Sequence, residues 1–330
     1  MLNQLSKLYG WIVERRNRAF DTGTHALIRV SVPVISVGNL TTGGTGKTPV
    51  VQEVVRMIQS LGHAPAVVMR GYNRASKGLK VVHDGTGIRG TVMESGDEAW
   101  MHAAELSVPV VVCNDKAEAA RYAAAELPCD CIVVDDGFQH RHLYRDVNIV
   151  LVDANTLHDT LLPAGHLREP IRNIARANVV LCSNGVGADV VREYCTPDTL
   201  FSTVDFIAQL SELQGKRVIC VSGIANPERF ENSVANNGAE IVKIVRYPDH
   251  HWYNKGEADT LLQYAVSHKA AIVTTHKDAV KLAKAEKMFR DSGIEYLVLP
   301  VAARIEKQRE LKNLIASHFN NYTQHENCNQ

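Results

Sequence analysis

Short apolar runs alternate with segments of helical periodicity along the first half of this 330-residue chain. The runs are rich in valine and isoleucine, which is typical of strands buried on both faces of a sheet. They span residues 34–37, 66–69, 108–113, 131–134, 149–152 and 179–182, and helical patterns fill residues 50–61, 97–105 and 117–127. This alternation predicts an α/β fold in which helices cover both faces of a mostly parallel sheet.

The periodicity weakens over residues 184–215, where turn-forming residues are frequent, and a second α/β pattern follows. Its predicted strands are 217–221, 240–245, 271–274 and 295–299, and its predicted helices are 227–236, 257–268, 277–284 and 305–317. A chain of this length is also more typical of two domains than of one. We therefore predict a larger domain over residues 1–200 and a smaller α/β domain over 201–330, joined near 184–215.

Residues 2–20 carry a separate amphipathic pattern. The apolar positions that share one helical face are Leu2, Leu5, Leu8, Tyr9, Ile12, Val13 and Phe20. Trp11 lies near the edge of this face, Arg16 interrupts it, and basic residues in the segment outnumber the single acid, Glu14. Two interpretations stay open. The helix packs its apolar face on the domain core, or it lies on an anionic membrane surface.

The overall composition excludes several classes of protein. Lysine plus arginine and aspartate plus glutamate both number 36, so no net positive charge favours nucleic acid as a partner. The seven cysteines are an odd number, and several lie in apolar runs, which favours buried, reduced thiols in a cytosolic protein. No apolar run is long enough to span a bilayer, and neither a signal peptide nor an obligate protein partner is evident.

The first predicted strand leads into a glycine-rich loop that ends in Gly-Lys-Thr. Glycines let backbone N–H groups converge on a phosphate, and the following helix N-terminus adds unpaired donors. Lys47 would then reach the β- and γ-phosphates of a nucleotide, and Thr48 would bind Mg²⁺. The strict pattern has glycine where this chain has Thr41, but strand, loop and helix occur in the required order. We predict a P-loop NTPase-like domain whose nucleotide-binding residues are Thr42, Gly43, Gly44, Thr45, Gly46, Lys47 and Thr48.

A second nucleotide signal is the apolar strand that ends in Asp135 and Asp136. The carboxyl ends of parallel strands meet at one edge of a sheet, where the phosphate loop also lies. Phosphoryl-transfer sites use such an acid to hold Mg²⁺. Asp-Asp-Gly can also be a plain strand-ending turn, but the loop upstream favours the metal interpretation. The cysteine and histidine pairs that flank this strand do not form a zinc site, because the strand itself covers about 13 Å.

Two further motifs place titratable groups at the ends of elements. Asp97 and Glu98 open a predicted helix, where the helix dipole favours carboxylates for structural reasons alone. Asp97 could instead be a base for an attacking hydroxyl. His250 follows a strand of the second domain, where it is either a turn residue or a group that orients such a base. Neither motif decides between its two interpretations by itself.

Together these motifs resemble the tetraacyldisaccharide 4′-kinase family, the lipid A 4′-kinases of Gram-negative bacteria. The matching segments, which run in order from residue 37 to residue 282, are VGNLTTGGTGKTP, RGYNR, SGDEAW, DDGFQH, LLPAGHLREP, SGIANPERF, PDHHWY and TTHKDAVKL. The resemblance implies a P-loop NTPase-like domain and a smaller α/β domain joined by a β linker. It also implies transfer of the γ-phosphate of ATP, with Mg²⁺, to the 4′-hydroxyl of a membrane-embedded tetraacyldisaccharide 1-phosphate. The family works as peripheral proteins on the cytoplasmic face of the inner membrane.

The resemblance also assigns residues. Lys47 and Thr48 fall at the phosphate and Mg²⁺ positions, Asp97 at that of the catalytic base, and His250 at that of its partner from the second domain. The positions near the metal and the γ-phosphate are Glu98, Asp135, Asp136 and Gln139. The arginines that match positions able to meet substrate or phosphate charge are Arg70 and Arg168.

The chain departs from the family motifs in two places. His166 stands where the LPAG-x-LREP motif usually has proline or another residue, and His276 stands where the TT-x-KDAVK motif usually has glutamate. A competing hypothesis is a P-loop switch that binds a protein partner and phosphorylates nothing. Such a switch would share the phosphate loop and Asp135 but would need neither Asp97 nor His250. An ATPase acting on nucleic acid is disfavoured by the zero net charge.

Overall fold

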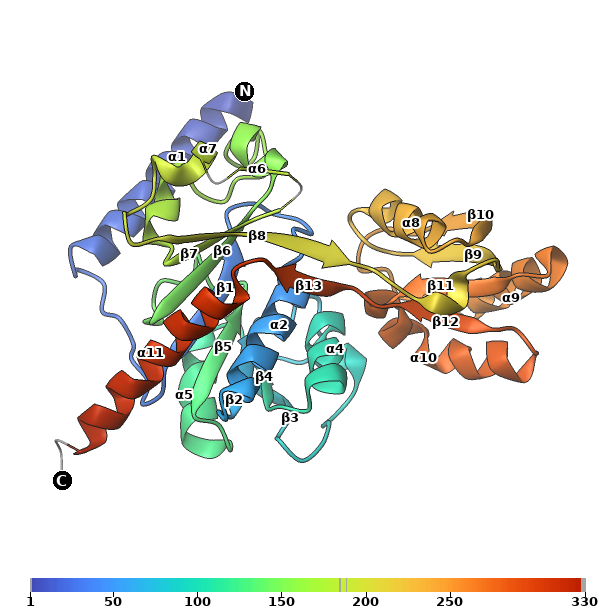
Figure 1. The fold of residues 1–330 in the computed structure, drawn as a ribbon, viewed down its shortest axis with the longest axis horizontal. Helices are drawn as coiled ribbons and strands as arrows, with labels where there is room; N and C mark the ends of the chain where they lie inside the picture. Colours follow the sequence, from blue (N-terminus) through green and yellow to red (C-terminus); the bar gives the residue numbers. More distant parts are fainter. Residues whose placement is uncertain (1, 184, 188, 328–330) are drawn as a thin grey trace.

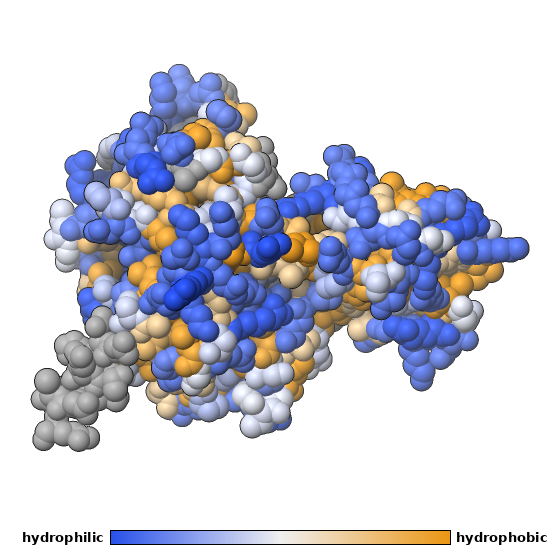
Figure 2. All heavy atoms as spheres, viewed as in Figure 1, coloured by the Kyte–Doolittle hydropathy of each residue, from blue (hydrophilic) through white to orange (hydrophobic). Residues whose placement is uncertain are grey.

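The computed structural model describes residues 2–183, 185–187 and 189–327, which form two lobes, each built on its own sheet (Figure 1). The larger sheet has nine strands in the order β13-β8-β7-β6-β1-β5-β2-β4-β3, and the smaller has four in the order β10-β9-β11-β12. Figure 2 shows the same two lobes with hydrophilic and hydrophobic residues intermixed on this face. Within the described ranges, no helix combines the length and apolar character needed to cross a membrane.

The larger sheet is parallel except at its two edges, where β3 and β13 run antiparallel to their neighbours. Its strands are β1 (Val34–Asn39), β2 (Pro65–Met69), β3 (Lys80–His83), β4 (Val110–Val112), β5 (Cys131–Asp135), β6 (Val147–Val152), β7 (Val179–Cys182), β8 (Leu200–Ile207) and β13 (Ala302–Ile305). Every residue of β1, β5 and β6 is buried, because helices cover both faces. The predicted α/β class with a mostly parallel sheet is confirmed.

The helices of the larger lobe are α1 (Leu2–Asp21), α2 (Lys47–Ser60), α3 (Val92–Ser95), α4 (Asp97–Leu106), α5 (Lys116–Glu126), α6 (Ala154–His158), η1 (Ile171–Arg176), α7 (Asp189–Arg192) and α11 (Gln308–Asn327). On one face of the sheet, apolar residues of α2, α4 and α11 form a single core with the strands. On the other face, the alanines of α5 pack against β2 and β5. The two cores fix the positions of the carboxyl ends of β1 and β5, which lie side by side in the middle of the sheet.

The smaller sheet is wholly parallel. Its elements are η2 (Ser211–Leu213), β9 (Arg217–Ser222), α8 (Pro227–Asn236), β10 (Glu240–Arg246), α9 (Lys255–His268), β11 (Ala271–Thr275), α10 (His276–Asp291) and β12 (Tyr296–Leu299). Helices α9 and α10 contribute to the core on one face, and α8 contributes to the core on the other. The six cysteines in the described part of the chain form no disulfide, in keeping with reduced thiols.

Two strands connect the lobes. β8 runs from the larger sheet toward the smaller lobe, and β13 returns beside it (Figure 1). α11 then packs back on the larger sheet through Leu311 and Ile315. The predicted smaller domain began at residue 201, whereas β8 and β13 pair within the larger sheet and α11 packs on it. The difference arises because β8 and β13 recognise each other across roughly a hundred residues, and local periodicity carries no such signal.

Candidate active site

The phosphate loop turns from β1 into α2 as its sequence pattern predicts. Asn39, the last residue of β1, organises the turn: its amide nitrogen donates to Thr41 Oγ1 at 3.2 Å and to Thr45 Oγ1 at 2.9 Å. Its Oδ1 accepts from Lys47 Nζ at 3.2 Å. Thr41, where the strict pattern has glycine, is thus part of the hydrogen-bonded frame of the loop. Asn39 was not among the predicted site residues, although it directly precedes the loop.

The end of the loop is packed against the strand that leads to the smaller lobe. Gly46, at the N-terminus of α2, has a φ of 87°, which favours glycine. A Cβ atom at Gly46 would lie 2.2 Å from Cζ of Phe206 in β8. Glycine is therefore required here both by the backbone conformation and by the close approach of the connecting strand.

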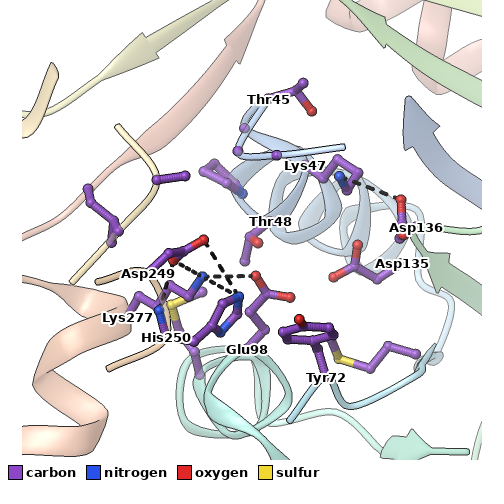
Figure 3. Close-up of a pocket in the computed structure, with 18 of the residues that line it drawn as sticks. Thr45, Lys47, Thr48, Tyr72, Glu98, Asp135, Asp136, Asp249, His250 and Lys277 are labelled. Carbon is purple, nitrogen blue, oxygen red and sulfur yellow. Dashed lines mark hydrogen bonds and ion pairs between the residues drawn. The ribbon is translucent and has the colours of Figure 1, made fainter. Parts of the chain in front are cut away.

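Asp136 lies opposite Lys47 across the loop (Figure 3). Arg168 donates hydrogen bonds of 2.8 and 2.9 Å to its two carboxylate oxygens, and Lys47 Nζ lies 3.5 Å from Oδ1. Burial alone would raise the pKa of Asp136, but the charges of Lys47 and Arg168 lower it well below the ordinary range. Arg168 also donates to Asn39 Oδ1 at 2.8 Å and to Gln139 Oε1 at 3.1 Å. The Arg168 guanidinium thus donates hydrogen bonds to three side chains around the phosphate loop, those of Asp136, Gln139 and Asn39.

Gln139 and the buried Glu169 extend this network to the N-terminal helix. The amide nitrogen of Gln139 donates to Glu169 Oε1 at 2.9 Å and to the main-chain carbonyl that ends β1. From α1, Asn17 donates to Glu169 Oε2 at 3.2 Å, and the Tyr9 hydroxyl donates to the carbonyl of Arg168 at 2.8 Å. Glu169 belongs to the LLPAGHLREP segment. Its position shows that α1 and the phosphate site share one polar layer.

Asp135, the other acid of the pair, is buried but lines the cleft. Its Oδ2 lies 3.1 Å from Nε2 of His102, a fully buried residue of α4. Lys116, the first residue of α5, donates to the carbonyl oxygens of Asp135 and Asp136 at 2.9 and 2.5 Å. Burial lowers the pKa of Lys116. Neither His102 nor Lys116 was predicted, since each looks like an ordinary helical residue in the sequence.

Asp97 and His250 meet across the two lobes, as the resemblance implied. His250 Nδ1 lies 3.0 Å from Asp97 Oδ2, and Lys281 Nζ lies 3.7 Å from the same oxygen. Asp97 is 4% exposed, whereas His250 lines the cleft. Burial alone would raise the pKa of Asp97, but the hydrogen bond from His250 and the charges of Lys277 and Lys281 outweigh it and lower the pKa. An ionised carboxylate therefore lies directly behind an imidazole in the cleft wall.

Glu98 faces a second lysine of the smaller lobe. Lys277 Nζ lies 3.5 Å from Glu98 Oε1 and 3.2 Å from Asp249 Oδ1, and Figure 3 shows the three side chains converging from both lobes. Burial raises the pKa of Glu98. Burial alone would lower the pKa of Lys277, but the neighbouring carboxylates raise it. Lys277 and Lys281 were not predicted as site residues, although their spacing of four places both on one helical face of α10.

These groups surround one cleft of about 880 Å³ between the lobes. The predicted residues in its wall are Thr42, Gly43, Gly44, Thr45, Gly46, Lys47, Thr48, Arg70, Glu98, Asp135, Asp136, Gln139, Arg168 and His250. Arg16 of α1 and Tyr72 also line it, and the smaller lobe contributes apolar and aromatic residues that include Ile224 and Phe230. Of the predicted site residues, Asp97 is the one that lies behind the wall. The structure thus gathers the predicted set from both lobes.

Of the two departures from the family motifs, His276 lines this cleft, and His166 contacts Thr42 of its wall. The His166 side chain is exposed and lies 2.9 Å from Asp159 Oδ2, while its carbonyl accepts from the Thr42 N–H at 2.8 Å. His276, at the start of α10, lies 2.6 Å from Glu105 of α4. The backbone at residue 166 therefore supports the phosphate loop whatever its side chain, and His276 contributes a side-chain contact between the lobes.

Oxygen ligands suited to Mg²⁺ come together in the cleft. The hydroxyl of Thr48 and the carboxylates of Glu98 and Asp135 all line it. Within the described ranges, no three acidic, histidine or cysteine side chains form a complete metal cage. Mg²⁺ usually takes one or two carboxylates together with water and substrate phosphates, and Asp135 and Glu98 are cleft carboxylates that could hold it.

A P-loop at the edge of a parallel sheet, facing a second α/β lobe across a cleft lined by acids and lysines, defines a P-loop phosphotransferase. A family model described as tetraacyldisaccharide-1-P 4′-kinase matches residues 1–320, and the chain belongs to that family. The tetraacyldisaccharide 4′-kinase of Syntrophus aciditrophicus is 34% identical over 96% of this chain and 91% of its own length. That of Anaeromyxobacter sp. strain Fw109-5 is 36% identical over 82% of this chain and 79% of its own length.

A crystal structure of LpxK from Aquifex aeolicus in complex with ATP has a similar fold. It superposes with a TM-score of 0.77 and 30% sequence identity, covering 96% of this chain and 98% of that one. The resemblance drawn from the motifs, the P-loop fold and the predicted class of enzyme, an ATP-dependent tetraacyldisaccharide 4′-kinase of lipid A synthesis, are confirmed. Membership of this kinase family argues against the competing hypothesis of a nucleotide switch that phosphorylates nothing.

Proposed function

We propose that the kinase reaction takes place in the interdomain cleft, with the Asp97–His250 pair as its proton acceptor. The acceptor oxygen, the 4′-hydroxyl of a tetraacyldisaccharide 1-phosphate, forms a bond to the γ-phosphorus of ATP while the bond to the β–γ bridging oxygen breaks. ADP leaves, and the hydroxyl proton passes to the pair. The observation that supports this most is the 3.0 Å contact between Asp97 and His250, because it joins an ionised carboxylate to a cleft-facing imidazole.

The phosphate loop and the lysines stabilise the charge on the transferring group. Backbone N–H groups at the start of α2 and the ammonium group of Lys47 face the position that the β- and γ-phosphates take in P-loop proteins. Phosphoryl transfer depends mainly on positioning and on such electrostatic stabilisation. Lys47 is held between Asn39 and Asp136, so its position is set before a nucleotide arrives.

Mg²⁺ is the metal that the donor set suits best. In this proposal Thr48, Asp135 and Glu98 hold the ion or its water ligands, and Asp136 and Gln139 lie beside them. The ion would neutralise charge on the bridging and terminal phosphate oxygens. Asp136 is already paired with Arg168 and Lys47, so we assign it to shaping the loop rather than to direct metal contact.

The second lobe completes the site. His250, Lys277 and Lys281 come from the smaller lobe, whereas Asp97 and Glu98 belong to the larger one. Separation of the lobes would break each of these contacts, so the catalytic arrangement exists only when the cleft is closed. Closure around both substrates excludes water and limits futile hydrolysis of ATP.

The N-terminal helix provides a docking surface for a membrane. α1 faces the protein with Ser6, Gly10, Asn17 and Phe20, and these are its buried residues. Its exposed large apolar residues are Leu2, Leu5, Leu8, Trp11 and Ile12. This is the reverse of a helix whose apolar face serves the core, and it supports the second of the two interpretations of the sequence. We assign the protein to the cytoplasmic face of the inner membrane, where ATP and the acylated acceptor are both accessible.

A direct assay tests the proposed reaction. The protein is incubated with Mg²⁺, radiolabelled ATP and a tetraacyldisaccharide 1-phosphate in mixed micelles, and labelled lipid is separated by chromatography. We expect label on the lipid with the wild type and a large loss with Asp97→Asn, which keeps the shape of the side chain. Release of inorganic phosphate from ATP without labelled lipid would contradict the proposal.

A further inference from the structure

We propose that His102 is a positioning residue for Asp135 and fixes the direction in which that carboxylate meets a divalent cation. This inference rests on the proposed metal site. His102 lies in the middle of α4, is fully buried, and places Nε2 3.1 Å from Asp135 Oδ2. Asp135 is itself buried and ends β5 in the cleft wall. The contact therefore ties the helix that carries Asp97 and Glu98 to the strand that carries the candidate metal acid.

The surroundings of the ring indicate which nitrogen carries the proton. Nδ1 of His102 is buried and has no hydrogen-bond partner among the described residues. The ring therefore makes its hydrogen bond through Nε2 alone. Nε2–H donates to Asp135 Oδ2, and Oδ1 is the oxygen left for a metal or its water ligand.

Asp135 and its neighbour Asp136 have different side-chain partners. Asp136 is paired with two cations, Arg168 and Lys47, which neutralise its charge. Among the described residues, the side chain within hydrogen-bond distance of the Asp135 carboxylate is His102. One imidazole N–H fixes the orientation of this carboxylate, which lacks the two cationic partners of Asp136. This is the part that outer groups play around metal-binding carboxylates, where their loss commonly weakens metal binding by about 10- to 100-fold.

Packing alone does not account for a histidine at this position. The neighbours of His102 on the buried face of α4 are the small or apolar residues Ala99, Ala103 and Leu106. An apolar side chain would fill the same space without leaving a buried nitrogen unpaired. The imidazole is the group in α4 that bonds to Asp135, and this bond sets β5 against the helix that carries Glu98. The contact therefore fixes the positions of the two candidate metal carboxylates, Asp135 and Glu98, relative to each other.

Two substitutions of His102 distinguish a role as hydrogen-bond donor to Asp135 from a role in core packing. His102→Gln puts an amide N–H₂ close to where Nε2 lies, and His102→Asn puts it near Nδ1, out of reach of Asp135. Binding of Mn²⁺ to the protein–ADP complex is measured from the loss of the free Mn²⁺ signal in electron paramagnetic resonance. Melting temperature, kcat and the KM for the glycolipid are measured in parallel. We expect His102→Asn to weaken Mn²⁺ binding by about 10- to 100-fold and His102→Gln to stay within a few-fold of the wild type. The KM for the glycolipid should be unchanged in both.

Two results would overturn the inference. One is Mn²⁺ binding by His102→Asn equal to that of the wild type. The other is equal loss in both variants in step with the melting temperature, because a packing role does not depend on where the donor lies. Asp135→Asn separates this inference from the proposed metal site. If that variant binds Mn²⁺ as well as the wild type, the metal site itself is wrong; if it loses binding while the His102 variants keep it, only the role of His102 is wrong.

Discussion

Replacing Leu5, Trp11 and Ile12 by serine should release the protein from anionic membranes without unfolding it. These side chains of α1 are 46%, 57% and 52% exposed, so roughly half of each apolar surface is still available for burial in lipid. At about 25 cal/mol per Å² of apolar surface, each substitution by serine should remove on the order of 1 kcal/mol from the free energy of membrane binding, or about 3 kcal/mol for the three together. That corresponds to a fall in the partition coefficient of roughly 100-fold. Folding should be little affected, because other residues of α1 contact the protein.

Sedimentation with vesicles of mixed anionic and zwitterionic lipids measures the partition coefficient directly, and circular dichroism gives the melting temperature. Val266→Ser is the matched control, since Val266 is 58% exposed and lies on α9 of the smaller lobe. Its partitioning should equal that of the wild type. With lipid substrate in vesicles, the apparent KM for the glycolipid should rise in the triple variant, whereas the KM for ATP should not change.

Unchanged vesicle binding in the triple serine variant would refute the reasoning, because the exposed face of α1 would then contribute nothing to docking. A large fall in melting temperature would also refute it, since it would show that these side chains support the fold. If high salt abolishes vesicle binding equally in the wild type and the triple variant, docking would depend on the basic residues instead.

Three further outcomes follow from the site. Lys47→Ala should lower kcat at least ~10²-fold, as loss of a charge-stabilising group commonly does, and near-normal turnover by the folded variant would remove the phosphate loop from the mechanism. Asp97→Asn should lower kcat ~10²–10⁴-fold with little change in the KM for ATP, whereas lost ATP binding with an unchanged kcat would make Asp97 a nucleotide residue. Burial raises the pKa of Glu98, so it gains a proton at higher pH than an ordinary glutamate and Mg²⁺ competes with that proton. The acid limb of the kcat/KM profile should therefore move to lower pH as Mg²⁺ is raised, and should not move in Glu98→Gln; a limb insensitive to Mg²⁺ in the wild type would contradict a metal role.

Most strands of both sheets could be predicted from the sequence, including the two edge strands of the smaller sheet, but β3, β8 and β13 of the larger sheet could not. β1, β5 and β6 are buried on both faces, so an unbroken apolar run is itself the signal. β13 has four residues that alternate between exposed and buried, and β8 mixes buried with exposed positions inside the segment predicted as a linker. Their pairing with each other defines them as strands, and pairing is a tertiary property.

The same division holds for the site. The phosphate loop, Asp135 and Asp136 could be found because a short stretch of chain contains the whole signal. The contact between Asp97 and His250 spans 153 residues, and only the resemblance to a family suggested it. Lys277 and His102 escaped prediction because the chemistry of each depends on a carboxylate from a distant element. A charged or imidazole side chain in a helix gives no sign in the sequence of the group that it faces.

The N-terminal helix shows why an apolar stripe and a buried face need not coincide. α1 approaches the protein closely because Gly10 has no side chain; a Cβ there would lie 2.7 Å from Cδ1 of Leu161. Hydrogen bonds from Tyr9 and Asn17, rather than burial of a wide apolar face, then hold the helix in place. Their acceptors are the Arg168 carbonyl and the Glu169 carboxylate, and the same two residues bind Asp136 and Gln139 in the cleft wall. A layer of hydrogen-bonded polar groups thus joins the proposed membrane surface to the phosphate site. Docking of α1 would therefore also set the orientation of the cleft over a lipid head group, without any contact between the lipid chains and the catalytic residues.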